Sequence, residues 1–182
     1  MKIWGIGLSK TGIVSLKEFL KGHGIHIIKY PDFKELHGDN DGGIDLPVAV
    51  QYKELDRGYP GSKFILTERN HDDWYHSITN WYLHRVIPDE PRFAMNRGWR
   101  KAAFGHENPN PVNTDFIDVY DTHVDTAIEY FENRPDDFLR INICDGDSTE
   151  ALCEFLDLDK SVTKFPHLHK SSDGYETEEL KL

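Results

Sequence analysis

Apolar and polar positions alternate along the chain in blocks that predict strands followed by helices. Four short apolar runs, each bounded by turn residues, have the length and composition of buried strands. The longer segments between them carry apolar residues at helical spacing. The predicted strands span residues 2–6, 25–30, 63–67 and 138–144. The predicted helices span about 12–23, 47–57, 114–133 and 149–156, and a further helix, capped by Asn70 or Asp72, carries the apolar residues from Trp74 to Leu83. A strand–helix–strand order of this kind favours a parallel sheet with right-handed crossovers.

The turn after the first predicted strand carries the clearest candidate chemistry. It contains Gly7, Leu8, Ser9, Lys10, Thr11 and Gly12, and the helical pattern starts directly after it. In such a turn, backbone N–H groups converge on an anion, and the positive end of the helix dipole adds to their attraction. Lys10 contributes a full positive charge, and the hydroxyls of Ser9 and Thr11 are further donors. We therefore interpret residues 7–12 as a phosphate-binding loop.

The loop departs from the pattern of the nucleoside triphosphatases. That pattern has a lysine and then a hydroxyl residue directly after its second glycine. In this chain Lys10 precedes Gly12, and Ile13 follows it. A small-molecule or nucleotide kinase, which needs a lysine after that glycine and ligands for magnesium, is therefore only an alternative.

Two segments resemble the cofactor-binding motifs of the sulfotransferases. The order Ser-Lys-Thr-Gly at 9–12 resembles their 5′-phosphosulfate loop, and residues 59–77 resemble their 3′-phosphate motif. In that motif an arginine at a strand end and a serine eight residues later bind the 3′-phosphate, and Arg69 and Ser77 have this spacing. A guanidinium group binds phosphate through two parallel hydrogen bonds, and a hydroxyl adds a directional donor. Similarity to small sulfotransferase-like proteins also covers residues 45–55, 140–156 and 165–168.

The resemblance implies both a fold and an activity. The implied fold is α/β, with three αβα layers around a central parallel sheet, of the P-loop nucleoside triphosphate hydrolase-like type. The implied activity transfers a sulfuryl group from 3′-phosphoadenosine 5′-phosphosulfate (PAPS) to a hydroxyl or amine of a small-molecule acceptor. Adenosine 3′,5′-bisphosphate is the other product, and no metal is needed. By resemblance, Lys10 stabilises the charge that develops on the bridging oxygen, the loop binds the 5′-phosphate, and Arg69 and Ser77 bind the 3′-phosphate.

A general base must take the proton of the acceptor, so it must lie near the loop. Asp45, at the start of a predicted helix, is the first candidate, and His37 is the second. Each residue also suits an ordinary role as a helix cap or a loop residue. The sequence leaves both assignments open.

One feature of the loop favours a second interpretation. The sulfotransferase loop usually continues with two threonines whose hydroxyls bind the 5′-phosphate, whereas Ile13 and Val14 follow Gly12 here. Losing a hydrogen bond to a charged group costs about 1.5–3 kcal/mol. The alternative is therefore a noncatalytic or degenerate sulfotransferase-like protein that binds a phosphorylated nucleotide.

Composition and charge limit the class of protein. A chain of 182 residues predicts one domain, here 1–170, followed by an acidic, mobile tail over 171–182. The net charge of −11 disfavours nonspecific binding to nucleic acid or to anionic membranes.

No apolar run is long enough to cross a bilayer and no signal-peptide pattern is present, so we expect a cytoplasmic protein. We expect Cys144 and Cys153 to be buried, reduced thiols. The acceptor and the oligomeric state stay open, and the basic and aromatic residues of 88–111 fit either an acceptor cover or a surface insertion.

Overall fold

Five short strands form one parallel sheet in the computed structural model, which describes residues 1–84, 96–146, 149–160 and 164–166. The strands are β1 (Ile3–Gly5), β2 (Ile27–Lys29), β3 (Gly42–Ile44), β4 (Lys63–Thr67) and β5 (Phe138–Ile141). Their order is β2-β3-β1-β4-β5, and each neighbouring pair is parallel. β1 is therefore the central strand, with β3 and β4 as its neighbours. The parallel sheet predicted from the sequence is confirmed.

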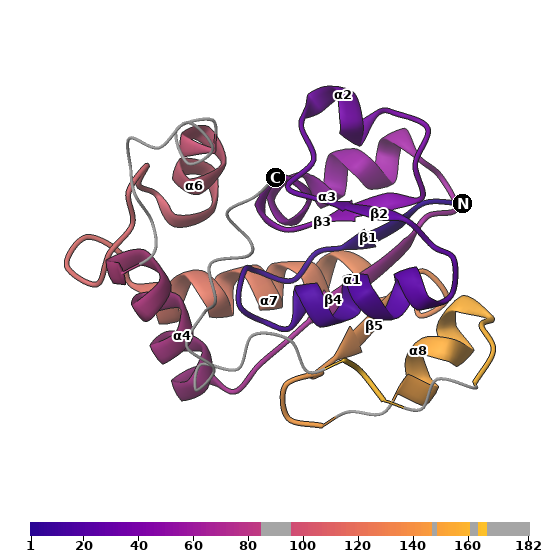
Figure 1. Cartoon of the computed structure of the whole chain (residues 1–182). Helices are drawn as coiled ribbons and strands as arrows, with labels where there is room; N and C mark the ends of the chain where they lie inside the picture. Colours follow the sequence, from indigo (N-terminus) through magenta and orange to yellow (C-terminus); the bar gives the residue numbers. More distant parts are fainter. Residues whose placement is uncertain (85–95, 147–148, 161–163, 167–182) are drawn as a thin grey trace.

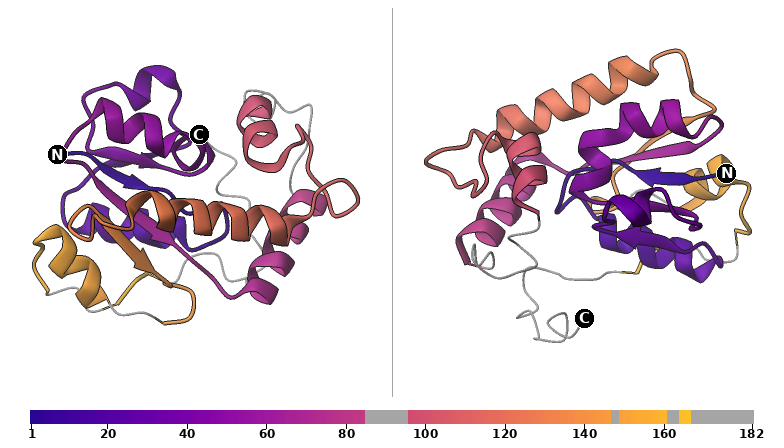
Figure 2. Two further views of the ribbon diagram at one scale, coloured as in Figure 1. Left: turned by 180° about the vertical axis from the view of Figure 1, so that it is seen from behind. Right: turned by 90° about the horizontal axis from the view of Figure 1, so that it is seen from above.

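Helices cover both faces of this sheet, so the three-layer αβα architecture is also confirmed (Figure 1). The helices are α1 (Ile13–Gly22), α2 (Phe33–Leu36), α3 (Leu46–Gly58), α4 (His71–His84), α6 (Arg97–Phe104), α7 (Phe116–Phe131) and α8 (Thr149–Leu156). The right-hand view of Figure 2 shows α1 on one side of the strands and α3 and α7 on the other. In Figure 1, α4 and α6 lie beyond the carboxyl ends of the central strands.

The central strands are buried on both faces, and side chains of β4 show how. Phe64 and Leu66 pack in the core on the side of α3 and α7, whereas Ile65 packs in the core on the side of α1 and α8. Burying a side chain of this size stabilises the fold by about 1.5–3 kcal/mol. Because both faces are covered, residues 63–67 form a continuous apolar run without the alternation of a half-exposed strand.

β3 lies between the strand predicted at 25–30 and the helix predicted at 47–57, where the sequence pattern predicts no strand. Gly42 pairs with Ile3, and its φ is 145°. A Cβ at Gly42 would lie only 1.8 Å from the carbonyl oxygen of Ile3, so glycine is required where these two strands meet. Glycine is rare in strands, so the glycine-rich composition of this segment does not predict β3.

Two other boundaries differ from the predicted ones. β5 ends at Ile141, three residues earlier than expected, because Asn142 turns the chain. The Asn142 side-chain oxygen accepts the N–H of Asp145 at 3.1 Å, and this local bond replaces further pairing in the sheet. Within the basic and aromatic segment 88–111, for which no helix is predicted, residues 97–104 form α6.

Some expectations fall outside the described residues. These are the acidic tail at 171–182, the proposed domain boundary at 170, and residues 88–95 of the basic and aromatic segment. Among the helices that the structure describes, none has the length and apolar character needed to span a membrane.

Candidate functional site

The loop at residues 7–12 connects β1 to α1 at the carboxyl edge of the sheet, and it is packed directly against β4. A Cβ at Gly7 would lie 2.0 Å from Thr67 Oγ1 and 2.6 Å from the Thr67 carbonyl oxygen. The Thr11 hydroxyl donates to the Leu8 carbonyl at 2.7 Å and lies 2.6 Å from Thr67 Oγ1. Because its single proton serves Leu8, Thr11 accepts from Thr67. Thr11 therefore holds the loop on β4, and its hydroxyl is not an open donor for a ligand.

Ser9 is likewise engaged within the protein. Its buried hydroxyl donates to Asp45 Oδ1 at 2.6 Å. Its carbonyl oxygen accepts the indole N–H of Trp74, on α4, at 2.9 Å. The sequence predicts that the hydroxyls of Ser9 and Thr11 are donors to a phosphate, and in the structure both hydroxyls bond to protein atoms instead.

The donors that stay open at the loop are backbone N–H groups at the start of α1. Gly12 is the N-cap of that helix with φ 91°, and glycine has no side chain to cap the first turn. The first N–H groups of a helix have no partner within it. These groups belong to Ile13, Val14 and Ser15, so they do not depend on the side-chain hydroxyls that Ile13 and Val14 lack. The helix dipole adds to their attraction for an anion.

Lys10 is the middle residue of the Ser9–Thr11 segment of the loop, and its side chain contacts α4. Its φ is 76°, a conformation that side-chain-bearing residues seldom adopt and that clusters at functional sites. Its ammonium nitrogen lies 5.0 Å from the ring centroid of Trp81, within the range of a cation–π interaction. Trp74 and Trp81 are seven residues apart and lie on the same face of α4. Ser77 lies between them on that face. The helix therefore presents Ser77 toward the loop.

Arg69 joins the loop to the end of β4. Its Nη1 donates to the carbonyl oxygen of Lys10 at 3.2 Å, while its Nε is buried and has no hydrogen-bond partner among the described residues. Tyr120, on α7, fixes the backbone of Arg69, because its hydroxyl accepts the Arg69 N–H at 2.8 Å and donates to the Arg69 carbonyl at 2.9 Å. Burial raises the pKa of Tyr120 to about 12, so this hydroxyl keeps its proton. A buried guanidinium N–H without a partner is costly, and an anion is its natural partner.

Asp45 brings a buried carboxylate against the loop. It is the N-cap of α3, and its Oδ1 accepts hydrogen bonds from the Ser9 hydroxyl and from the N–H of Leu46. Burial raises the pKa of Asp45, and the nearby charge of Lys29 partly opposes that rise. Its backbone angles, φ 81° and ψ −172°, fall in a region used almost only by glycine and cost about 1–3 kcal/mol. A general base must lie near the loop, and the first candidate, Asp45, does lie there in the structure.

Comparison with known proteins agrees with this arrangement. A family model described as "Sulfotransferase domain" matches residues 26–174, which include Asp45, Arg69 and Ser77. The chain belongs to the sulfotransferase family. The matched segment begins after residues 7–12, so the family match does not include the loop. The interpretation of the loop depends on its geometry in the structure.

The chain is also similar to a curated protein. It is 29% identical over 161 residues to "Ava biosynthesis cluster protein M" of Aspergillus versicolor. The match covers 79% of this chain and 59% of the relative. The chain therefore corresponds to about three-fifths of that protein's length.

His37, the second candidate base, is not brought to the loop at residues 7–12. Its imidazole is exposed, and Nδ1 lies 2.8 Å from the Tyr59 hydroxyl. The next residue, Gly38, accepts a hydrogen bond from the ammonium of Lys2, which precedes β1. α2 carries the chain back from the carboxyl end of β2 to the amino end of β3. His37 consequently lies at the opposite edge of the sheet from the loop.

Three residues near the site were missed by the sequence analysis. Tyr120 and His123 lie on α7, and His123 Nε2 is 2.7 Å from the Ile6 carbonyl oxygen just before the loop. Cys144 is exposed, and its sulfur is 3.3 Å from the position of a Cβ on Gly12. The expectation of a buried thiol was wrong for Cys144 and is confirmed for Cys153. The position of Cys144 at the carboxyl end of the strand predicted at 138–144 was the one available signal, since parallel strands end at a shared edge.

Metal-ligand chemistry is not prominent in the part of the chain that the structure describes. There, no three side chains of histidine, cysteine, aspartate or glutamate come together in a way that could hold a metal ion.

Proposed function

We propose that this sulfotransferase transfers a sulfuryl group from PAPS to a hydroxyl or amine of a small-molecule acceptor. The observation that carries the proposal is the position of Arg69, which bonds to the carbonyl of Lys10 and keeps a buried Nε–H without a partner among the described residues. An arginine placed beside an anion-binding loop supports recognition of a ligand with two separate phosphate groups.

Each group at the site has a role in this proposal. The N–H groups at the start of α1 bind the 5′-phosphate, and Arg69 and Ser77 bind the 3′-phosphate. The acceptor oxygen or nitrogen forms a bond to sulfur while the bond from sulfur to the bridging oxygen breaks. Lys10 stabilises the negative charge left on that oxygen, which departs as part of adenosine 3′,5′-bisphosphate.

Asp45 is the proposed base that receives the acceptor proton. A carboxylate with a raised pKa is a stronger base than an exposed one, and Asp45 gains that property from burial. Its bond to Ser9 keeps it at the edge of the loop. His37 has no such contact, and we do not assign it a role in the reaction.

The proposed acceptor is a small molecule. The name of the relative from Aspergillus versicolor refers to a biosynthesis cluster, which supports a metabolite as acceptor more than a macromolecule. A cytoplasmic location stays a prediction.

A noncatalytic protein that binds the same nucleotide is the second candidate. It is favoured by Ile13 and Val14, which supply no hydroxyls, and by the internal bonds of Ser9 and Thr11. Binding and turnover must therefore be measured separately.

Calorimetric titration with adenosine 3′,5′-bisphosphate tests the proposal. We expect the wild type to bind it more tightly than ATP, which lacks the 3′-phosphate. Arg69→Ala should weaken binding about 10- to 100-fold, since hydrogen bonds to charged groups contribute about 1.5–3 kcal/mol. Arg57→Ala is the matched control, because Arg57 is an exposed arginine paired with Glu54 at the far end of α3. Absence of binding by the wild type would sink the proposal.

Turnover of PAPS with a panel of hydroxyl and amine acceptors then separates the two candidates. Asp45→Asn retains an oxygen that can accept from Ser9 and Leu46, so it should bind the bisphosphate normally but transfer no sulfuryl group. Tight binding by the wild type without turnover on any acceptor would favour the noncatalytic protein.

A further inference from the structure

The two side-chain oxygens of Asp45 have different surroundings. Oδ1 accepts the hydroxyl of Ser9 at 2.6 Å and the N–H of Leu46 at 3.0 Å, so both of its lone pairs are used. Oδ2 receives neither of these bonds, and it is not one of the fully buried polar atoms of the described chain that lack a partner. Although Asp45 as a whole is only 2% exposed, Oδ2 therefore keeps some accessible surface. Oδ2 is the oxygen that a reacting group can reach.

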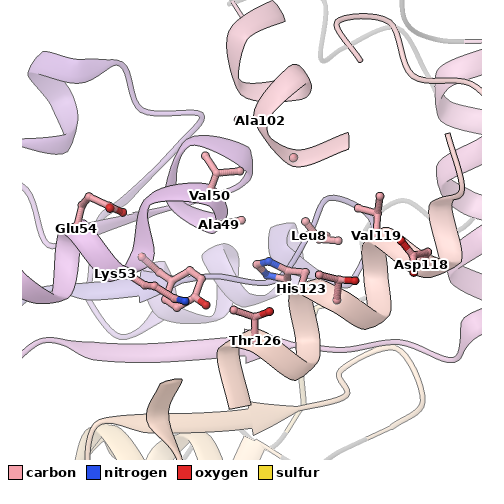
Figure 3. A pocket seen from close by; sticks show the side chains of 13 residues that line it. Leu8, Ala49, Val50, Lys53, Glu54, Ala102, Asp118, Val119, His123 and Thr126 are labelled. Atoms are coloured by element: carbon pink, nitrogen blue, oxygen red, sulfur yellow. The ribbon is translucent and has the colours of Figure 1, made fainter. Parts of the chain in front are cut away.

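A groove of about 410 Å³ between α3, α6 and α7 is a separate feature (Figure 3). Leu8 of the loop lines it, together with Ala49 of α3 and His123 of α7. As far as the structure describes the groove, its lining includes neither Ser9 nor Asp45. Oδ2 is therefore not reached through this groove.

Ser9 ties the carboxylate of Asp45 to the loop. Its buried hydroxyl donates to an ionised acceptor, a kind of hydrogen bond that is short and strong. Ser9 directly precedes Lys10, and its carbonyl oxygen accepts the indole N–H of Trp74. The Ser9 contact therefore fixes the orientation of Asp45 relative to Lys10, the residue proposed to stabilise the departing oxygen.

Tyr30 supplies a second hydroxyl beside Ser9. It follows β2 as Asp45 follows β3, and the last residues of these strands, Lys29 and Ile44, are paired in register. Its φ is 53°, which is an outlier for a bulky side chain, and its N–H donates to the Ile44 carbonyl at 3.2 Å. The Tyr30 hydroxyl lies 3.5 Å from Ser9 Oγ, and because Ser9 gives its proton to Asp45, Tyr30 is the donor in this longer contact. Two neighbouring strand ends with positive φ thus meet at one serine, and strain of this kind clusters at functional sites.

The ionisation of Asp45 depends on these donors. Burial raises the pKa of Asp45. The charge of Lys29 opposes this rise, and so do the hydrogen bonds from Ser9, Leu46 and Tyr30. Burial also raises the pKa of Tyr30 and of Tyr82, so both hydroxyls keep their protons. The other titratable and charged groups around Asp45 and Tyr30 are Lys29 of β2, Tyr82 of α4 and Arg100 of α6.

We propose that Oδ2 of Asp45 takes the acceptor proton and that Ser9 and Tyr30 are positioning residues that act through Asp45. This inference rests on the proposed function. As the acceptor atom bonds to sulfur, its proton passes to Oδ2, and the electron pair of the breaking sulfur–oxygen bond leaves with adenosine 3′,5′-bisphosphate. Ser9 and Tyr30 keep their own protons throughout. Their bonds hold Oδ1, so that Oδ2 stays turned toward the acceptor.

A titration of Asp45 in the full chain tests this role without any substrate. The aspartate carboxyl carbons are labelled with carbon-13, and the Asp45 signal is the one missing from Asp45→Asn. Ser9→Ala removes a donor to the ionised carboxylate, so the midpoint of the Asp45 titration should move to higher pH. Tyr30→Phe keeps the ring and should move the midpoint in the same direction by less, because its contact is longer.

Ser62→Ala is the matched control for this titration. Ser62 is also buried, and its hydroxyl donates at 2.6 Å to the carbonyl of Tyr59, at the opposite end of α3 from Asp45. The Asp45 titration of this variant should equal that of the wild type.

Turnover of PAPS gives a second readout, which a merely structural role would not move. With an acceptor hydroxyl that is protonated at the assay pH, Ser9→Ala should lower kcat about 10-fold, the effect of one hydrogen bond to a charged group. The loss should be larger at about pH 6 than at about pH 8, because less Asp45 is ionised in the variant at low pH. A nitrophenol that is already ionised at the assay pH needs no base, so with this acceptor the loss should vanish.

An Asp45 titration that neither Ser9→Ala nor Tyr30→Phe changes would overturn the proposal, whatever the activity of the variants. A loss of kcat that is equal at every pH and equal for the nitrophenol would overturn it as well. If the wild type turns over no acceptor, the proposed function fails, and the titration still decides whether Ser9 and Tyr30 act on Asp45.

Discussion

The two faces of the sheet are built from different kinds of side chain. The face under α1 and α8 is almost entirely aliphatic, with Leu16, Leu20, Ile65 and Leu152 among its fully buried members. The face under α3, α4, α6 and α7 is rich in aromatic side chains. Its core includes Trp4, Tyr52, Phe64, Trp74, Tyr82, Phe104, Phe116, Tyr120 and Phe131.

The difference matters because large aromatic side chains combine apolar surface with a polar atom at one end. Trp74 donates to the carbonyl of Ser9, Tyr120 binds both backbone groups of Arg69, and His123 bonds to the carbonyl of Ile6. Each of these contacts fixes the loop or the strand end beside it. The aliphatic face therefore supplies stability, while the aromatic face also positions the site.

Removing buried volume from each face gives the largest expected contrast. Leu20→Ala, on the aliphatic face, should lower the free energy of unfolding by about 2–5 kcal/mol, because it deletes buried methyl groups and leaves a cavity. The folded fraction should still bind adenosine 3′,5′-bisphosphate with unchanged affinity. Chemical denaturation and calorimetry measure the two quantities.

Trp74→Phe is the counterpart on the aromatic face. It keeps most of the apolar surface but removes the N–H that serves Ser9, so affinity should fall about 3- to 10-fold. If Leu20→Ala lost affinity as strongly as Trp74→Phe, the proposed division of labour between the faces would be wrong.

Two glycines sharpen the contrast at the loop itself. Gly7→Ala forces a Cβ to within 2.0 Å of Thr67 Oγ1, so the free energy of unfolding should fall by about 1–3 kcal/mol. The displaced loop should also bind the bisphosphate about 10-fold more weakly or worse, since a hydrogen bond to a charged group contributes about 1.5–3 kcal/mol. Gly22→Ala is the control, because a Cβ there meets nothing within 4 Å at the end of α1. It should stabilise the protein by about 0.5–1 kcal/mol with no change in affinity. Equal affinities for the two variants would exclude the loop as the binding site.

The smallest expected effect is a pH dependence that comes from His123. Burial lowers the pKa of His123 in the folded protein, while the hydrogen bond to Ile6 partly opposes that fall. The unfolded chain therefore binds the proton more readily, and stability should decrease as the pH falls below about 6.5. His123→Gln can still donate to Ile6 but does not titrate. The wild-type stability minus that of the variant should fall with decreasing pH, by at most about 1.4 kcal/mol for each pKa unit of difference. A flat difference between pH 7 and pH 5 would contradict the burial of His123.

The sequence was most informative where chemistry depends on neighbours along the chain. The strand–turn–helix pattern at the loop and the spacing of Arg69 and Ser77 predicted the fold class and the sulfotransferase family, and both are confirmed. The roles given to these residues stay predictions. The sequence failed at β3, where glycines serve a close approach of two strands, and at His37, where a short helix returns the chain to the wrong edge of the sheet.

Local patterns therefore determined the alternation of strands and helices, the position of the glycine-bearing turn at residues 7–12 and the strand-end arginine. Only the tertiary structure decided which hydroxyls stay open and which carboxylate reaches the loop. It also decided how α4 and α7 hold the site. The physical reason is distance along the chain. Ser9 and Asp45 are 36 residues apart, Arg69 and Tyr120 are 51 apart, and Ile6 and His123 are 117 apart. Contacts of this range leave no periodicity or spacing in the sequence, because they exist only once the parallel sheet has brought the carboxyl ends of its strands together.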